Sequence, residues 1–315
     1  MLDQTELTTH ATLALLARYR LEVVLAVRPW TLDGLPETLR ALAASEIPVT
    51  LWPMIADREG RWASVYNAQA FAPFVPELRA CVAAAGLGAY PVLYDLEPPI
   101  DVVARIGEWA AAGGPARSVR ALVTLASLAP GPRGCALETS MRLLADDGVE
   151  VLSAVAPMVL FDSPRGRRRQ VFSRLLGMPE VDACRTITVM AYTSMIEGWS
   201  RRSLRREDAV SVLSFLASRA RTRWGLRAGL SLGTVGPGAL RDEPCYRSPD
   251  ELAVDVAVAA SAGVTDLALF ELRGVLEREP ERWLGPFTAP HAPVRVALTP
   301  RVRALVGLLS PLSRA

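Results

Sequence analysis

Lysine is absent from this sequence of 315 residues, so all 35 of its basic side chains are arginines. Without a lysine the chain cannot form a Schiff base with a carbonyl substrate or with pyridoxal phosphate. A phosphate-binding loop of the Walker type also requires a lysine. These classes of chemistry are therefore excluded. The absence itself is typical of a GC-rich coding sequence, which favours Ala, Arg, Gly and Pro codons.

Histidine and cysteine are scarce as well. His10 and His291 lie near opposite ends of the chain, so a multi-histidine metal centre is not expected. The four cysteines are far apart and show no CxxC spacing: Cys81, Cys135, Cys184 and Cys245. We expect buried free thiols rather than a disulfide framework or a zinc site. The sequence predicts no metal and no cofactor.

Long apolar runs are missing too. None approaches the roughly 20 residues needed to span a bilayer, so no membrane partner is predicted. Asp3 and Glu6 stand where a secretory signal would carry positive charge, so no signal peptide is expected in this chain. The compartment stays open, because an upstream start could add an export signal. The formal net charge of +2 gives no electrostatic case for nucleic acid, and nothing indicates an oligomeric state.

One unit recurs along the chain: a short β-branched or apolar run, a polar or Pro/Gly loop, and an amphipathic stretch rich in Ala, Leu and Arg. The runs predict strands over Glu22–Val27, Pro48–Met54, Ala89–Leu96, Glu150–Val159, Thr186–Tyr192, Arg227–Leu232 and Asp266–Leu272. The stretches between them predict helices over Leu35–Ala44, Phe74–Ala85, Ile100–Ala112, Cys135–Asp146, Asp208–Arg223 and Pro249–Ala262. Glycines after several helices predict C-caps, namely Gly86, Gly148, Gly225 and Gly263.

Apolar strands separated by helices are typical of a parallel sheet covered by helices. No change in composition marks a linker, so residues 1–315 are predicted to form a single domain. A helical pattern at Thr8–Tyr19 precedes the first strand, whereas a (β/α)8 TIM barrel begins with a strand. We therefore expect a TIM barrel that lacks its first strand. A doubly wound sheet is the alternative, but Arg28-Pro29-Trp30 follows the first visible strand instead of a Gly-rich turn.

Active residues of barrels lie at the C-terminal ends of strands. There Asp95 and Glu97 are two residues apart, so both side chains point the same way. Two carboxylates this close repel each other, which raises one pKa and prepares that group as an acid near neutral pH. The alternative is that both are solvated, or that Asp95 caps the following helix.

Aromatic residues gather at or just beyond the same strand ends. The hydroxyl of Tyr192 would donate a hydrogen bond to developing charge in a pocket, or would be satisfied in an ordinary core. Aromatic faces there suit sugar or apolar ligands, although each could simply pack against its neighbours: Trp30, Trp52, Trp62, Trp199 and Phe270.

With these motifs the chain resembles glycoside hydrolase family 18, the chitinase-like TIM barrels. Asp95-Leu96-Glu97-Pro98 is similar to the end of the DxxDxDxE signature of that family's fourth strand. The run Leu152–Pro157 resembles its fifth strand, and Met190-Ala191-Tyr192 resembles its sixth-strand Met-x-Tyr-Asp. Phe270-Glu271-Leu272-Arg273-Gly274 is similar to its eighth-strand Trp-Glu-Leu-Ser-Gly. The order and spacing of the motifs agree with the family.

The resemblance implies a retaining, metal-independent glycoside hydrolase acting on a carbohydrate. Glu97 would be the general acid/base, and Asp95 would orient the N-acetyl group of the substrate, which acts as the nucleophile. Tyr192 would donate a hydrogen bond to that group, Met190 belongs to the same motif, and Phe270 would form the floor of a subsite. In a related variant Glu97 pairs with Glu271, although strand alternation turns Glu271 away if Phe270 faces inward.

The chain departs from the family pattern at four positions. Tyr90 and Leu93 replace the two earlier aspartates of the signature, Thr193 replaces the Asp after the tyrosine, and Phe270 replaces Trp. An alternative function is therefore a glycan-binding barrel without catalysis.

Two weaker signals leave further alternatives open. The loop Gly233–Gly238 could hold a phosphate, as in many metabolic barrels, or be only a turn. Two arginine clusters follow the fifth and sixth strands, and they would suit an acidic glycan or form solvated loops: Arg165, Arg167, Arg168 and Arg169, then Arg201, Arg202, Arg205 and Arg206.

Overall fold

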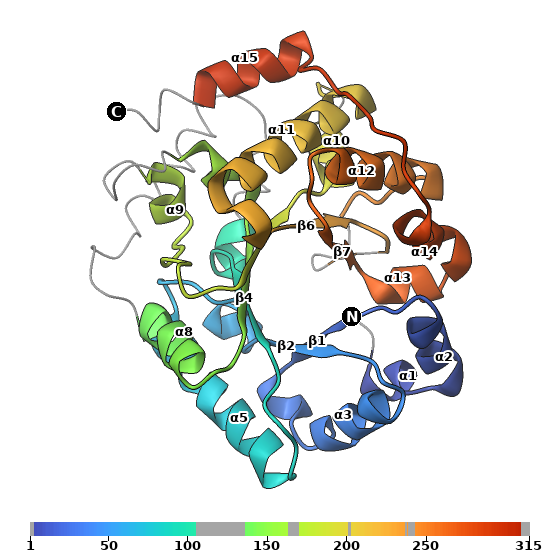
Figure 1. Ribbon diagram of the computed structural model, residues 1–315. Coiled ribbons are helices and arrows are strands. Elements are labelled where there is room, and N and C mark those ends of the chain that lie inside the picture. Colours follow the sequence, from blue (N-terminus) through green and yellow to red (C-terminus); the bar gives the residue numbers. More distant parts are fainter. Residues whose placement is uncertain are drawn as a thin grey trace. The chain divides into compact units, whose positions relative to one another are not determined.

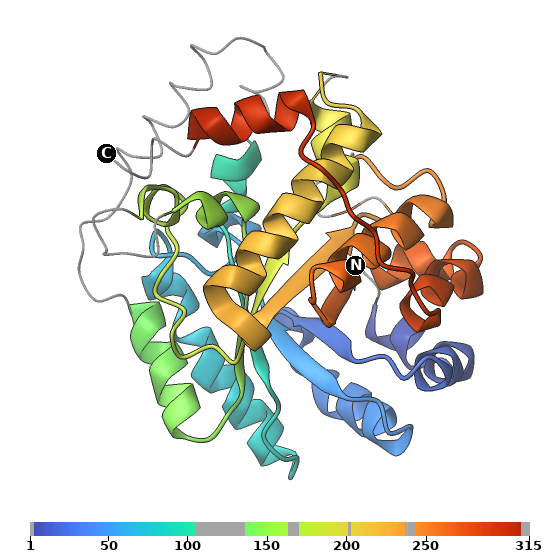
Figure 2. The same ribbon diagram turned by 45° about the horizontal axis from the view of Figure 1, so that its top comes forward.

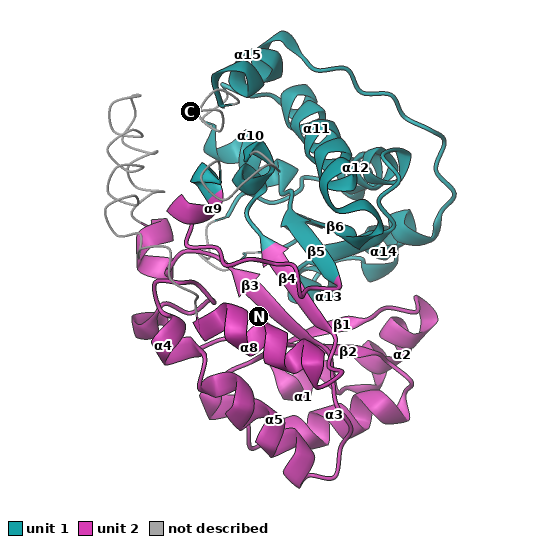
Figure 3. Cartoon of the chain, turned by 60° about the vertical axis from the view of Figure 1, so that its left-hand side comes forward, with its two compact units in different colours: residues 1, 155–172, 186–315 teal, residues 2–154, 173–185 magenta. Residues whose placement is uncertain are grey.

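The computed structural model describes residues 3–104, 136–162, 170–200, 203–236, 238 and 243–309. The chain divides into two compact units (Figure 3). Unit 2 comprises residues 2–154 and 173–185, and unit 1 comprises residue 1 with residues 155–172 and 186–315. The chain therefore passes from one unit to the other more than once.

In the described residues, seven parallel strands follow one another in sequence order with helices between them. The fold is α/β, of the TIM-barrel type, and these residues hold one strand fewer than the eight of a complete barrel. All seven predicted strands are confirmed: β1 Val23–Val27, β2 Val49–Pro53, β3 Val92–Leu96, β4 Val151–Val155, β5 Thr186–Met190, β6 Ala228–Gly233 and β7 Asp266–Phe270 (Figure 1). Between Asp3 and β1 the described chain holds helices and no strand, as expected for a barrel without its first strand.

Unit 2 carries β1 to β3, most of β4, and their helices. The helical elements are α1 Gln4–Leu7, α2 His10–Arg18, η1 Pro29–Thr31, α3 Leu35–Ala44, η2 Asp57–Glu59, α4 Ala68–Phe71, α5 Phe74–Ala84 and α8 Ala136–Asp146. The predicted helix Thr8–Tyr19 corresponds to α2, which begins after Thr9 because the Thr9 side chain accepts a hydrogen bond from the backbone of Thr12, and the short helix α1 before it was not predicted. Alternate residues of β1 are buried while Val24 is 41% exposed. The buried set faces the helices, where Leu35, Leu39 and Leu42 of α3 are fully buried.

Unit 1 carries β5 to β7. Its helical elements are η3 Pro157–Phe161, α10 Thr193–Trp199, α11 Arg206–Trp224, η5 Gly225–Arg227, α12 Pro249–Ser261, α13 Leu272–Leu276, α14 Pro280–Thr288 and α15 Pro300–Leu309, while α9 Val171–Leu175 runs from unit 1 into unit 2. β6 pairs with β5 and with β7, and all six of its residues are buried. The long helix α11 and the shorter α12 lie against β6 (Figure 2).

Glycines end the helices as predicted. Gly86, Gly148 and Gly263 adopt positive φ angles of 70°, 78° and 77° just after α5, α8 and α12. A side chain with a Cβ rarely adopts this backbone conformation, so glycine suits the position. Within the part of the chain that the structure describes, no helix has the length and apolar character needed to cross a membrane.

Candidate functional site

The acidic pair lies at the C-terminal end of β3. The Tyr94 hydroxyl shares a hydrogen bond of 2.7 Å with Ser140 of α8, and its ring centroid is 5.9 Å from that of Phe71 of α4. Tyr94 therefore faces the helices, so strand alternation turns Asp95 to the inner face of the sheet. Glu97, two residues further, follows the strand and is half-buried.

Asp95 is almost completely enclosed, with 4% of its surface exposed. Within the described residues its Oδ1 atom is buried and has no hydrogen-bond partner. Burial raises the pKa of the Asp95 carboxyl from 3.8 to about 7, because the charged form loses its hydration. Asp95 therefore holds a proton up to near-neutral pH, and the cause is its burial.

Trp52 of β2 points to the same face of the sheet as Asp95 and lies nearer the N-terminal ends of the strands. Leu51 of β2 is level with Val92 of β3, so Trp52 is level with Leu93, two residues before Asp95. Residues that are level on adjacent parallel strands point to the same side, and Trp52 is half-buried there.

The loop after β2 runs along the end of β3. Ala63 pairs with Leu96, and the Ala63 amide donates a hydrogen bond of 3.0 Å to the Asp95 carbonyl. Asn67 fixes this loop by donating to the Trp62 carbonyl at 2.8 Å. Trp62 itself is only 4% exposed, so its ring packs inside the protein in this structure.

In unit 1, Tyr192 and Phe270 lie together at the ends of β5 and β7. Their rings are stacked, with centroids 5.9 Å apart and an interplanar angle of 21°. Ser231 of β6 donates a hydrogen bond of 3.2 Å to the Tyr192 hydroxyl. A Cβ atom at Gly233 would lie 3.0 Å from Cδ1 of Tyr192, so the absence of a side chain there lets the ring approach the strand. Met190, at the end of β5, is buried.

Glu271 contacts different neighbours from Phe270. Its side chain is buried, and Oε1 lies 3.6 Å from the position that a Cβ atom at Gly236 would take. The backbone of Gly274 meets the loop after β6 so closely that a Cβ there would lie 1.9 Å from the Val235 carbonyl oxygen. Glu271 therefore points toward this loop while Phe270 stacks on Tyr192, in keeping with the predicted alternation.

The loop Gly233–Gly238 uses its first amides internally. Thr234 N–H donates to Ser194 Oγ at 2.8 Å, and Val235 N–H donates to the Phe270 carbonyl at 2.7 Å. These two amides are therefore unavailable to a phosphate group. Pro237 of this loop lies outside the described residues.

The other two tryptophans that were predicted to contact a ligand are open to solvent. Trp30, in η1 directly after β1, is 62% exposed, and Trp199, at the end of α10, is 54% exposed. Six of the arginines in the two predicted clusters lie outside the described residues, namely Arg165, Arg167, Arg168, Arg169, Arg201 and Arg202.

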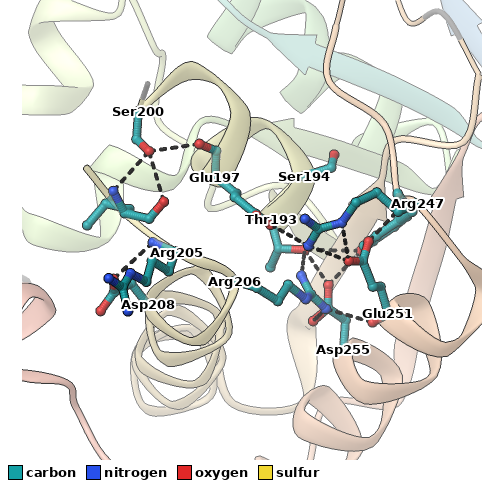
Figure 4. Close-up of polar contacts among 12 residues, drawn as sticks. Thr193, Ser194, Glu197, Ser200, Arg205, Arg206, Asp208, Arg247, Glu251 and Asp255 are labelled. Carbon is teal, nitrogen blue, oxygen red and sulfur yellow. Dashed lines mark hydrogen bonds and ion pairs between the residues drawn. The ribbon is translucent and has the colours of Figure 1, made fainter. Parts of the chain in front are cut away.

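Thr193, directly after Tyr192, belongs to a buried polar network that the sequence analysis did not predict. Arg206 donates to Thr193 Oγ1 at 2.6 Å and pairs with Asp255 Oδ1 at 2.6 Å (Figure 4). The Tyr246 hydroxyl donates to Asp255 Oδ2 at 2.7 Å, and Thr193 donates to the same atom. Arg206, which we expected in a rim cluster, is instead committed to this network.

Burial and the Arg206 charge shift the pKa of Asp255 in opposite directions. Burial raises the pKa of Asp255, although the nearby Arg206 guanidinium acts in the opposite direction. Burial also raises the pKa of Tyr246 well above its usual value, with the Asp255 charge adding to the effect. The network therefore ties α10, α11 and α12 together through polar groups with little contact with water.

No group of three or more His, Cys, Asp or Glu side chains suited to a metal ion occurs in the described ranges of the chain.

Comparison with known proteins gives no family. No family model and no curated protein matches the sequence. Among solved structures the chain is similar to the glycoside hydrolase domain of PgaB (BpsB) from Bordetella bronchiseptica, with 10% identity and a TM-score of 0.47 over 82% of this chain and 81% of that one. It is also similar to HMG-CoA lyase from Brucella melitensis, with 11% identity and a TM-score of 0.33 over 90% of this chain and 80% of that one. Because both scores are below 0.5, neither likeness bears on activity.

Proposed function

We propose that the chain is a carbohydrate-acting barrel, a retaining and metal-independent glycoside hydrolase of the chitinase-like type. The observation that carries the proposal is the enclosed Asp95 carboxyl, which is two residues from Glu97 at the C-terminal end of a barrel strand. Active residues of TIM barrels occupy this end of the strands. Two carboxyl groups in different surroundings are the usual arrangement for acid/base work on a glycosidic bond.

The two carboxyl groups have different roles in this proposal. Glu97, which is half-buried, protonates the leaving glycosidic oxygen and then activates water. Asp95 keeps its proton up to about pH 7 and uses it to orient the N-acetyl group of the sugar. Within unit 1, the Tyr192 hydroxyl accepts a hydrogen bond from Ser231.

A glycan-binding barrel without catalysis is the second candidate. One observation favours it: Thr193, which stands where the family has an aspartate, is committed to Asp255 and Arg206. The position after Tyr192 therefore helps to hold helices together and supplies no carboxylate to a substrate.

The test is cleavage of a panel of labelled neutral, N-acetylated and acidic oligosaccharides by wild type, Glu97→Gln and Asp95→Asn. We expect Glu97→Gln to lower kcat/KM about 10²–10⁴-fold, the usual contribution of a general acid/base. Glu37→Gln is the matched control, because Glu37 is exposed on α3 and should leave turnover unchanged. Equal turnover by wild type and Glu97→Gln would remove Glu97 from the mechanism. Saturable binding without product would favour the glycan-binding candidate.

A further inference from the structure

In unit 2, two arginines pair with one aspartate, and each of these arginines lies over a tryptophan ring. The set is Arg28, Trp30, Asp57, Arg61 and Trp62, here called the Arg–Trp cluster. Arg28 Nη1 lies 3.0 Å from Asp57 Oδ1, and Arg61 Nη2 lies 2.7 Å from Asp57 Oδ2. The Arg28 guanidinium is centred 5.1 Å from the Trp30 ring, and that of Arg61 is 5.4 Å from the Trp62 ring. The cluster therefore lies at the C-terminal ends of β1 and β2, where barrels bind ligands.

Asp57 fixes the two guanidinium groups. The hydrogen bond from Arg61 is the largest effect on the pKa of the Asp57 carboxyl; together with the Arg28 hydrogen bond it lowers that pKa to about 2, although partial burial acts in the opposite direction. Asp57 is therefore charged at every physiological pH. Although the Asp57 side chain is 52% exposed, those of Arg28 and Arg61 are only 13% and 14% exposed. The carboxylate therefore holds two largely enclosed arginines in fixed positions.

One edge of the Arg28 guanidinium has no protein partner among the described residues. Its Nη1 atom donates to the Ile55 carbonyl at 3.2 Å and to Asp57. In the described part of the chain its Nε and Nη2 atoms make no hydrogen bond or ion pair, and neither is a buried, unpartnered atom. Both atoms therefore reach solvent. The Nε–Nη2 edge of a guanidinium is a flat pair of donors that matches the two oxygens of a carboxylate.

The backbone around Arg28 is also fixed. Two hydrogen bonds join it to Thr31. Arg28 N–H donates to Thr31 Oγ1 at 2.9 Å, and Thr31 N–H donates to the Arg28 carbonyl at 2.9 Å. The same turn holds Trp30, whose indole is 62% exposed and whose ring centroid lies 5.1 Å from the Arg28 guanidinium carbon. Exposed aromatic faces suit the C–H face of a sugar ring. A sugar and an anion can thus be bound side by side.

The cluster belongs to the same end of the sheet as the acidic pair. Trp62 directly precedes Ala63, whose amide donates to the Asp95 carbonyl at 3.0 Å. The Gly60 carbonyl accepts a hydrogen bond of 3.2 Å from Ile100, three residues after Glu97. The loop that carries Asp57 and Arg61 is therefore bonded to the segment that carries Asp95 and Glu97.

The geometry points to a subsite for a uronic acid residue, in which Arg28 binds the sugar carboxylate through Nε and Nη2 and Trp30 stacks on the sugar ring. This assignment rests on the proposed carbohydrate function and names its substrate class: a glycan that contains uronate.

Binding, measured by isothermal titration calorimetry on the full chain, tests the assignment separately from catalysis. The ligand is a tetrasaccharide that alternates glucuronate with N-acetylglucosamine, and its control is the same tetrasaccharide with each carboxyl group reduced to an alcohol. We expect wild type to bind the acidic form about 10- to 100-fold more tightly, which is the usual value of a hydrogen bond to a charged group. Sodium glucuronate should compete, whereas sulfate at the same ionic strength should not.

Variants locate the effect. Arg28→Gln should abolish the preference for the acidic form, and Trp30→Ala should weaken both forms without changing the preference. Arg40→Gln is the matched control, because Arg40 is an exposed arginine of α3 whose bond goes to the Ala85 carbonyl. Because Trp30 is largely exposed, Trp30→Ala should fold, and it therefore tests the subsite even if Arg28→Gln does not fold.

The outcomes separate the two proposals. Equal affinity for both forms, an unchanged preference in Arg28→Gln, or competition by sulfate would overturn the uronate subsite alone. If wild type binds neither tetrasaccharide and no member of the oligosaccharide panel, both the uronate subsite and the carbohydrate function are overturned. If it binds members of the panel but neither tetrasaccharide, only the uronate subsite is overturned.

Discussion

At the scale of single residues, the position of Asp95 decides its chemistry. The sequence predicts a perturbed carboxylate pair from spacing alone, and it assigns the raised pKa to neither member. The structure shows why Asp95 is the perturbed one: it lies on the strand under the loop 55–67, whereas Glu97 lies beyond the strand end. Asp95 is buried by a loop that lies about 30 residues earlier in the chain, and the local motif carries no information about that loop.

The raised pKa makes stability depend on pH in a defined direction. The folded chain keeps the Asp95 proton up to about pH 7, whereas the unfolded chain releases it near pH 4. The unfolded state therefore binds fewer protons between these values, so stability falls as pH rises from about 4 to 7. Asn does not titrate. We expect the free energy of unfolding of Asp95→Asn, relative to that of wild type, to rise by about 2–4 kcal/mol from pH 4 to pH 8.

Urea denaturation at pH 4, 6 and 8, followed by tryptophan fluorescence, measures this difference. Asp33→Asn is the control, because Asp33 is exposed and its substitution should give the same difference from wild type at every pH. If the gap between Asp95→Asn and wild type stays constant with pH, Asp95 does not titrate in this window.

At the scale of secondary-structure elements, local patterns predict where strands lie but not always where they end. The run Glu150–Val159 is mostly apolar, yet β4 ends at Val155 because Pro157 begins the 3-10 helix η3. A proline has no N–H for the ladder, so the residues after it leave the sheet. The helical pattern at Asp208–Arg223 is extended by two residues at its start, where Arg205 N–H is bonded to Asp208.

The network around Asp255 could not be predicted from the sequence, because its bonded members are 9 to 62 residues apart. Removing the carboxylate would leave the Arg206 charge and two hydroxyl groups without their acceptor. We expect Asp255→Ala to lower the free energy of unfolding by about 3–5 kcal/mol, as for other broken buried ion pairs. Chemical denaturation of wild type and variant at pH 7 measures the loss.

Arg247→Ala is the matched control for this network. It breaks the pair of Arg247 with Glu251, one helical turn from Asp255, but the Arg247 side chain is 64% exposed. An exposed pair contributes about 1 kcal/mol or less. Similar losses in Asp255→Ala and Arg247→Ala would show that the buried network has no special part in holding α10, α11 and α12.

At the scale of the whole molecule, the path of the chain argues for one cooperative domain. Each compact unit is built from separate stretches of sequence, and unit 1 takes residues 155–172 as well as residues 186–315. The sequence predicts one domain over 1–315 for a different reason, the lack of any linker. Neither compact unit corresponds to a continuous piece of chain, so one domain over 1–315 stays a prediction, which fragments of the chain can test.

Helix α11 shows what a continuous piece would lose. Phe161 of η3 lies 5.5 Å from Phe215 between ring centroids, and the arginines of α11 donate to carbonyl groups of η3. Arg219 donates to Leu160 at 2.9 Å, and Arg223 donates to Val159 at 2.7 Å. A fragment of residues 186–315 lacks all of these partners and exposes the apolar face that they cover.

We therefore expect the fragment 186–315 to lack native near-ultraviolet circular dichroism, and co-expression with the fragment 1–185 to restore it. The intact chain should unfold in a single transition, with circular dichroism and tryptophan fluorescence giving the same midpoint. Independent folding of 186–315, or two separate transitions in the intact chain, would contradict the single domain. In that case β5 to β7 with their helices would be an autonomous unit, and the contacts of η3 with α11 would be dispensable for its stability.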